Sequence, residues 1–137
     1  MATPPERAEP VASNEDPARG GPRLVRMAVL LVAAVLSGLL MIDLCNLVYA
    51  CGCRSWWAGA AAACNVFSPD PPHCPWCMAG WWGLGLPLGA VIAAQGAVLL
   101  WPGRASLLAR SLLAAAAFPA VGSFVAVAWG MIVGYWS

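Results

Sequence analysis

Three long apolar runs constrain the fold of this 137-residue chain more than any other feature of its sequence. The first extends from Met27 to about Tyr49, and as a helix it would be about 34 Å long, which is enough to cross a bilayer. Hydrophobic residues make up 61% of the chain and charged residues only 9%, as is typical of a chain surrounded by lipid. The sequence therefore predicts an all-α integral membrane protein with three transmembrane helices, at about residues 24–49, 75–101 and 109–136.

The segment before the first run has a different composition. Residues 1–22 are rich in Pro, Glu, Ala and Gly and have no apolar periodicity, so we expect a disordered tail. The stretch before Cys51 loosely resembles a signal-peptide cleavage site, but the apolar run is longer than a signal core and carries Asp43 near its end. We therefore expect a retained membrane helix and one membrane domain over residues 23–137.

The arginines predict the orientation in the membrane. Only Arg54 lies between the first and second runs. The arginines that directly flank the runs on the other side are Arg19, Arg23, Arg26, Arg104 and Arg110. Because positive segments stay in the cytoplasm, we expect a cytoplasmic tail and an extracytoplasmic loop over residues 51–74 at the inner membrane. The net charge of +1 gives no reason to expect nucleic acid as a partner, and a single histidine argues against hydrolase chemistry.

Small residues predict how the helices pack. One stripe recurs at every fourth position of the third run and consists of Gly122, Ala126, Gly130 and Gly134. Small residues permit close backbone approach, so we expect this stripe to contact other helices. Gly85 and Gly89 form a second pair of this kind in the middle run, and Gln95 should hydrogen-bond to another helix.

All the cysteines lie between the first and second runs or at their borders, together with the one histidine, His73. They are Cys45, Cys51, Cys53, Cys64, Cys74 and Cys77. An extracytoplasmic compartment permits disulfides, whereas six thiols kept reduced would indicate metal binding or catalysis. The sequence leaves three interpretations open: thiol–disulfide exchange, metal binding and a structural staple.

The most specific motif is His73-Cys74-Pro75-Trp76-Cys77. Proline is favoured at the first position of a helix, which predicts that Cys74 is the N-cap residue, beside free amides and the positive end of the helix dipole. Such a position stabilises a thiolate, and a protonated His73 adds positive charge. Cys77 lies one turn further, so we expect Cys74 to be the exposed nucleophile and Cys77 the more buried resolving thiol. The motif thus favours thiol–disulfide exchange.

A Cys-x-x-Cys at the outer end of the second membrane helix resembles the disulfide bond formation protein B family, and the vitamin K epoxide reductase family has a similar motif. The resemblance covers about residues 27–110 and rests on topology together with Cys74 and Cys77. It implies that these cysteines pass electrons from an extracytoplasmic thioredoxin-like protein to a membrane quinone. The arginine that the family places just after the motif is missing, since residues 78–81 read Met-Ala-Gly-Trp. The family's second outer cysteine pair is also missing, and its substitutes would be Cys51, Cys53 and Cys64.

Metal binding is the alternative that the same residues support. Cys51-Gly-Cys53 and Cys74-x-x-Cys77 each space two thiolates so that both can reach one ion, and soft sulfur donors select Cu(I) or Zn(II). The candidate ligands are Cys51, Cys53, Cys64, His73, Cys74 and Cys77, and a metallochaperone is the implied partner. The third interpretation is a disulfide-stapled structural or interaction subunit, because so short a loop cannot bury a core.

Overall fold

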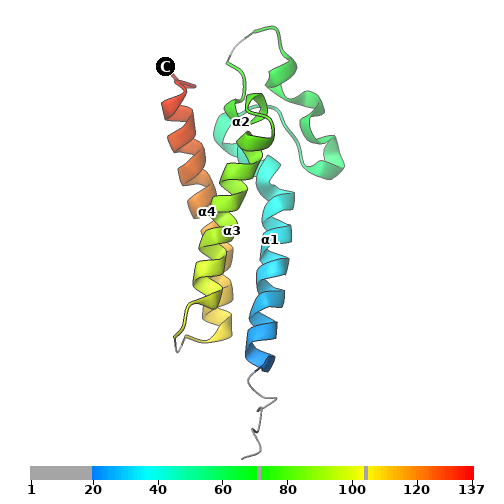
Figure 1. Ribbon diagram of the computed structural model, residues 1–137. Helices are drawn as coiled ribbons and strands as arrows, with labels where there is room; N and C mark the ends of the chain where they lie inside the picture. The colour runs from blue at the N-terminus through cyan, green and yellow to red at the C-terminus, as the bar shows by residue number, and fades with distance from the viewer. Residues whose placement is uncertain (1–19, 71, 104) are drawn as a thin grey trace, which may run out of the picture.

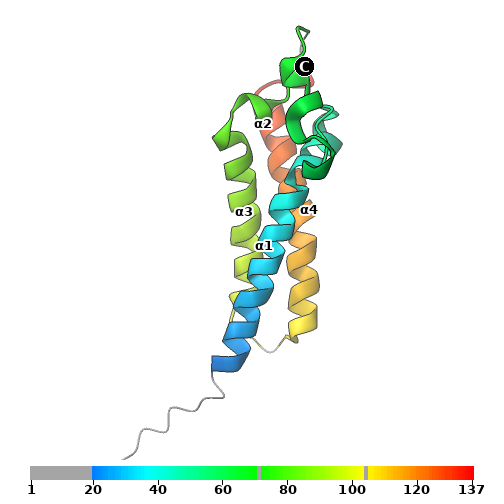
Figure 2. The ribbon, with the colours of Figure 1, turned by 90° about the vertical axis from the view of Figure 1, so that its right-hand side faces the viewer.

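Three long helices form the body of the protein in the computed structural model, which describes residues 20–70, 72–103 and 105–137 (Figure 1). They are α1 (Gly20–Tyr49), α3 (Trp81–Leu100) and α4 (Leu107–Ile132). Between α1 and α3 come three short 3-10 helices, η2 (Trp56–Ala58), η3 (Ala60–Ala63) and η4 (Asn65–Phe67), and the four-residue helix α2 (Pro75–Met78). Figures 1 and 2 show the long helices side by side, with the intervening segment gathered at one end.

The expected disordered tail falls almost wholly outside the described residues, which begin at Gly20. The last three residues assigned to that tail are helical instead, because α1 already begins at Gly20. Arg19 and Arg104, which contributed to the predicted orientation, also lie outside the described residues.

Each long helix is long and apolar enough to cross a membrane. The three candidate spans contain 27, 20 and 26 residues, and even the shortest is about 30 Å long as a helix. Only 28%, 28% and 17% of their most apolar windows are buried inside the molecule, so most of these side chains face outward. An apolar surface of this extent requires lipid around it, which confirms the predicted all-α fold with three membrane-type helices and a cysteine-rich segment after the first.

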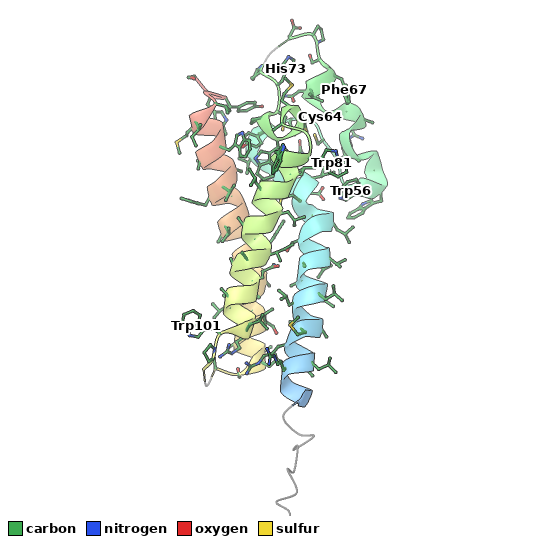
Figure 3. All side chains as sticks on the ribbon, in the orientation of Figure 1. Trp56, Cys64, Phe67, His73, Trp81 and Trp101 are labelled. Atoms are coloured by element: carbon green, nitrogen blue, oxygen red, sulfur yellow. The ribbon has the colours of Figure 1, made fainter. Side chains whose placement is uncertain are left out.

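Exposed tryptophans mark the two ends of α3. Trp81 at its start is 95% exposed and Trp101 just after its end is 68% exposed. Figure 3 shows Trp81 beside the cysteine-rich segment, together with Trp56, and Trp101 at the opposite end of the bundle. Indole rings in this arrangement match the aromatic belts that flank the hydrocarbon core of a bilayer.

The small stripe of α4 packs inward, as predicted, for three of its four members. Gly122, Ala126 and Gly130 are buried, and a Cβ on Gly122 would lie 2.4 Å from the Leu44 side chain of α1. Gly134 does not belong to the stripe, because α4 ends at Ile132 and Gly134 is exposed in the following turn with φ of 69°.

The prediction for Gly85 and Gly89 was wrong. Both residues are exposed, and a Cβ added to either would meet no other part of the protein within 4 Å. The buried side of α3 instead contains Gly83 and Pro87, which have the same four-residue spacing two positions earlier. The packed side of α3 is therefore opposite to the one that the two predicted glycines occupy.

Gln95 hydrogen-bonds to both neighbouring helices, as predicted. Its Nε2 donates to Ser37 Oγ of α1 over 2.9 Å and to the Ala114 carbonyl of α4 over 3.3 Å. The side chain is 1% exposed, so these bonds form away from solvent. One amide thus fixes the positions of all three helices at the middle of the bundle.

Arg110 caps the end of α3 that lies away from the cysteines. Arg110 is 4% exposed, and its guanidinium donates to the carbonyls of Val98 over 3.1 Å and Ala105 over 3.3 Å, and also to that of Trp101. The last carbonyls of a helix lack partners within the helix, and a charged donor satisfies them. The α3–α4 link is therefore held closely against the bundle.

The second predicted helix, 75–101, is broken. It begins at Pro75 as expected, but α2 ends at Met78 and α3 starts at Trp81 after Gly80, which has φ of 58°. A Cβ on Gly83 would lie 1.8 Å from the Trp76 carbonyl, so the turn brings α2 directly against the start of α3. This close approach positions α2 across the head of the bundle.

Candidate functional site

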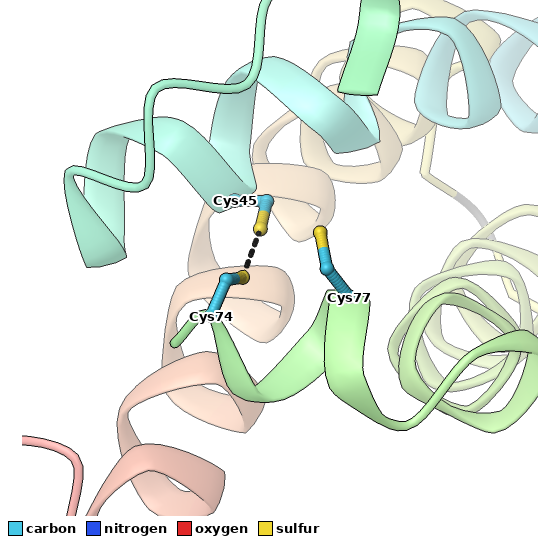
Figure 4. Close-up of side chains that lie close together, drawn as sticks. All are labelled: Cys45, Cys74 and Cys77. Carbon is cyan, nitrogen blue, oxygen red and sulfur yellow. Dashed lines mark hydrogen bonds between the residues drawn. The ribbon is translucent and has the colours of Figure 1, made fainter. Parts of the chain in front are cut away.

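All six cysteines converge at one end of the bundle. Cys45 comes from the last turns of α1, Cys74 and Cys77 from the head and body of α2, and the other three from the loop between them. The Sγ–Sγ distances are 3.2 Å for Cys45–Cys74, 3.2 Å for Cys64–Cys77, 3.6 Å for Cys53–Cys77 and 3.7 Å for Cys45–Cys51. Figure 4 shows the sulfurs of Cys45, Cys74 and Cys77 directed toward one another.

The sulfurs form three triads in which every Sγ lies within 4.8 Å of the other two. The triads are Cys45–Cys74–Cys77, Cys51–Cys64–Cys74 and Cys53–Cys64–Cys77. We refer to the six cysteines in these triads as the cysteine cluster. Among the described residues, no histidine or carboxylate joins a triad.

The loop backbone explains why the thiols meet. The chain leaves α1 through Ala50 and Gly52, which both have positive φ, and the Asn46 side chain accepts a hydrogen bond from the Gly52 amide. A Cβ on Gly52 would lie 2.5 Å from the Ala63 carbonyl, so only glycine permits this approach. The turn places Cys51 beside the segment that carries Cys64.

Asn65 fastens the loop to the head of α2. Its Oδ1 accepts from the Cys74 amide over 2.8 Å and its Nδ2 donates to the Pro72 carbonyl over 2.7 Å. Its backbone amide donates to the Cys51 carbonyl over 2.7 Å. Asn65 thus connects three segments of the site, although nothing in its sequence context indicated that it would.

His73 lies beside Asn65 and outside every triad. Its Nδ1 is 3.0 Å from the Asn65 carbonyl, an acceptor, which makes Nδ1 the protonated nitrogen of the ring. The hydrogen bond from His73 to the Asn65 carbonyl therefore helps to hold the loop in place. The sequence grouped His73 with the cysteine ligands because of adjacency alone.

The exposure of Cys74 and Cys77 is opposite to the prediction. Cys74 is 0% exposed, whereas Cys77 is the one cysteine of the cluster that is not fully buried. The loop and Asn65 cover Cys74 from outside, which its position at a helix start could not reveal. Cys77 is consequently the one thiol of the cluster that has surface exposed.

Neighbouring thiols set the electrostatics of this pair. Hydrogen bonds from the Cys45 and Cys51 thiols lower the pKa of Cys74, and those from Cys45 and Cys74 lower the pKa of Cys77 to about 4. Burial, with a contribution from the Cys64 thiol, raises the pKa of Cys53. The expected contribution of a helix dipole is small, because α2 has only four residues.

An aromatic group closes the cluster on the side of α4. Tyr49 packs edge-on against Trp76 at 5.7 Å and against Tyr135 at 5.0 Å, and it stacks on Trp136 at 5.7 Å. The Tyr49 hydroxyl donates to the Ala126 carbonyl, and the Tyr135 hydroxyl donates to the Tyr49 carbonyl. The C-terminal turn is thereby fixed against the end of α1 next to the cysteines.

Two residues near the end of α1, Cys45 and Asp43, take part in the site although the sequence had not assigned them to it. Cys45, which lies within the first apolar run, was not among the predicted ligands, yet it contributes to a triad. Its position about one turn before the end of α1 could have indicated that its side chain lies close to the loop cysteines. Asp43 accepts a hydrogen bond from Ser55 Oγ over 2.5 Å, so this membrane-end carboxylate helps to attach the loop.

The fold and the site together define a small membrane-type protein of three long helices with a buried cysteine cluster at one end. Comparison with protein-family models, with curated proteins and with solved structures found no match. The assignment of a function therefore depends on the cluster itself.

Proposed function

We propose that this protein binds a thiophilic metal ion at the membrane surface through the cysteine cluster. The observation that carries this proposal is the arrangement of six sulfurs in triads within 4.8 Å. A metal ion bound to three thiolates at about 2.3 Å holds their sulfurs about 4 Å apart, which is close to the spacing of the cluster. Sulfur donors of this kind select soft ions such as Cu(I), or Zn(II).

The triad of Cys45, Cys74 and Cys77 is the best candidate for the first ion. It joins α1 to α2, and it contains Cys77, through which an ion can enter from solvent. The other two triads each depend on two cysteines of the loop, although Cys53–Cys64–Cys77 shares the accessible thiol. A metallochaperone that offers its ion to Cys77 is the class of partner that this geometry suits.

The proposed location is the inner membrane, with the cysteine cluster on the extracytoplasmic face. Arg23 and Arg26 occupy the start of α1, and together with Leu100 they line one cavity at the end away from the cysteines. Arg110 lies at that same end. Positive charge collected at one end supports a cytoplasmic position for that end.

Replacement of Cys74 and Cys77 together tests the proposal, because every triad contains at least one of them. Reduced wild-type protein in lipid nanodiscs should retain Cu(I) or Zn(II) after desalting, as measured by elemental analysis. The variant Cys74→Ser/Cys77→Ser should retain none. Met78→Leu, which removes an exposed sulfur next to Cys77, is the matched control and should bind as wild type does. Wild-type protein that is isolated with all cysteines oxidised and binds no ion after reduction would contradict the proposal.

Thiol–disulfide exchange is the second candidate, and it follows the resemblance to the disulfide bond formation protein B family. Two Sγ–Sγ distances of 3.2 Å, for Cys45–Cys74 and Cys64–Cys77, favour it. In this reaction a thioredoxin-like dithiol becomes a disulfide, a disulfide of the cluster is reduced to two thiols, and a membrane quinone then accepts the two electrons and two protons.

Exposure makes Cys77, rather than Cys74, the entry point for exchange. The cysteines that share a triad with Cys77 are Cys45, Cys53, Cys64 and Cys74. Their replacement by serine should then trap a mixed disulfide with a thioredoxin-like protein through Cys77, as seen on non-reducing gels. If the cluster instead holds three disulfides that resist mild reductants, a structural staple is the correct interpretation.

A further inference from the structure

The triads of the cysteine cluster share their members in a regular way. Cys64, Cys74 and Cys77 each belong to two triads, whereas Cys45, Cys51 and Cys53 each belong to one. Every triad therefore consists of two shared sulfurs and one unshared sulfur. Isolated disulfides would pair sulfurs in twos, whereas shared corners are the connectivity of a thiolate cluster in which sulfurs bridge metal ions.

We infer that the cysteine cluster binds three Cu(I) ions, one in each triad, with the sulfurs of Cys64, Cys74 and Cys77 each bridging two ions. This inference rests on the proposed metal-binding function and adds the number of ions, their identity and the role of each cysteine. Cys45, Cys51 and Cys53 are then the terminal ligands, one for each ion.

The number of donors distinguishes Cu(I) from Zn(II). A structural zinc site takes four protein ligands in a tetrahedron, and each triad offers three sulfurs with no histidine or carboxylate among the described residues to complete it. Cu(I) is soft and accepts three sulfur ligands in a plane. The donor set of the cluster thus matches the preference of Cu(I) at all three positions.

Loading the cluster is a ligand exchange without a change of oxidation state. Cysteine binds a metal ion as the thiolate, so the six thiols release six protons to solvent as three Cu(I) ions enter. Each ion enters as Cu(I), so no electron is transferred during loading.

Single serine substitutions separate the bridging from the terminal positions. Cys64→Ser removes a ligand from two triads and leaves one intact, whereas Cys51→Ser removes a ligand from one triad and leaves two. Both side chains are buried, at 3% and 1% exposure, so the two variants form a matched pair. We expect the Cu(I) capacity to fall from three ions per chain to one in Cys64→Ser and to two in Cys51→Ser.

The capacities are measured by titrating reduced protein in nanodiscs with Cu(I) against a chromogenic Cu(I) chelator, with helix content checked by circular dichroism. X-ray absorption of loaded wild-type protein adds a test that needs no variant and should show copper scattering from copper. Equal losses in the two variants, or a single ion without copper–copper scattering, would overturn the trinuclear cluster and leave the proposed function intact. A failure of the reduced protein to bind any ion would overturn both.

Discussion

At the scale of single residues, exposure divides the Cys74 and Cys77 pair in a way that controls their chemistry. Cys74 is 0% exposed beneath the loop, and Cys77 is half-buried. Neighbouring thiols donate hydrogen bonds to both, but only Cys77 can be reached by a reagent or a partner. The accessible thiol is therefore the second cysteine of the motif.

Alkylation of reduced, metal-free protein should modify Cys77 first. Because its pKa is lowered to about 4, its thiolate fraction is already complete at pH 6, and the rate should be nearly constant from pH 6 to pH 8. An ordinary thiol would instead react about tenfold faster for each pH unit in this range, since its thiolate fraction rises in proportion. Peptide mass spectrometry after timed quenching measures the rate at each cysteine.

The variant Cys77→Ser is the control for this experiment and should lose the fast phase. Cys53, whose pKa is raised by burial, should remain unmodified over the same range. A faster reaction at Cys74 than at Cys77 would contradict the assignment.

The sequence identified most of the residues of the site, but not their arrangement. Cysteine and histidine can be recognised by type, so six of the residues near the cluster were found directly. The exposure of each cysteine could not be predicted from the sequence, because it depends on where the loop lies over α2. Asn65 was missed for the same reason: its bonds to Pro72 and Cys74 span seven and nine residues and exist only in the folded loop.

At the scale of elements, the break between α2 and α3 decides where the cysteine motif lies. Gly80 turns the chain and Gly83 lets the start of α3 touch the Trp76 carbonyl. A continuous helix would carry Cys74 and Cys77 along the axis of α3, away from the end of α1. The turn instead places them next to Cys45.

Alanine substitutions at Gly83 and Gly85 test this contact. Gly83→Ala would place a Cβ 1.8 Å from the Trp76 carbonyl and should destabilise the protein by about 1–3 kcal/mol or more. Gly85→Ala, two residues later in the same helix, meets nothing within 4 Å and should be neutral or stabilising by up to about 1 kcal/mol. Thermal unfolding in detergent measures both.

Similar melting temperatures for the two alanine variants would show that the close approach at Gly83 is absent in solution. Cysteine alkylation of Gly83→Ala offers a second measure, since displacement of α2 should expose Cys74.

The long helices could be predicted from sequence because length and hydropathy are properties of each run by itself. Which side of a helix packs inward is a property of its neighbours. Gly83 with Pro87 and Gly85 with Gly89 have the same spacing, but only the first pair lies on the side of α3 that is buried, together with Val91, Gln95 and Leu99. The prediction that Gly134 belongs to the buried stripe of α4 was wrong for a local reason, because α4 ends at Ile132.

At the scale of the whole molecule, the two ends of the bundle have opposite chemistry. One end carries the cysteine cluster, the aromatic group around Tyr49 and the C-terminus (Figure 1). The other carries the start of α1 with Arg23 and the α3–α4 link held by Arg110. This polarity is the basis of the proposed orientation.

Two exposed alanines at opposite ends allow the orientation to be measured. Ala62→Cys lies in the loop and should react with a membrane-impermeant maleimide added to intact cells, above the wild-type background. Ala105→Cys lies in the α3–α4 link and should react only after the membrane is permeabilised. The reverse pattern would place the cysteine cluster in the cytoplasm and remove the inferred extracytoplasmic partner.

The hydrogen bonds of Asn65 determine how the site would respond to chelation. They connect the backbone of Cys51, Pro72 and Cys74 without any contribution from the sulfurs, so we expect the loop to keep its shape when an ion is removed. Such a site is preorganised, and an ion that enters it does not have to order the chain, in contrast to a zinc finger that is unfolded without metal. Chelators should therefore empty the site reversibly with an unchanged far-ultraviolet spectrum, and refilling should be limited by ligand exchange rather than by folding.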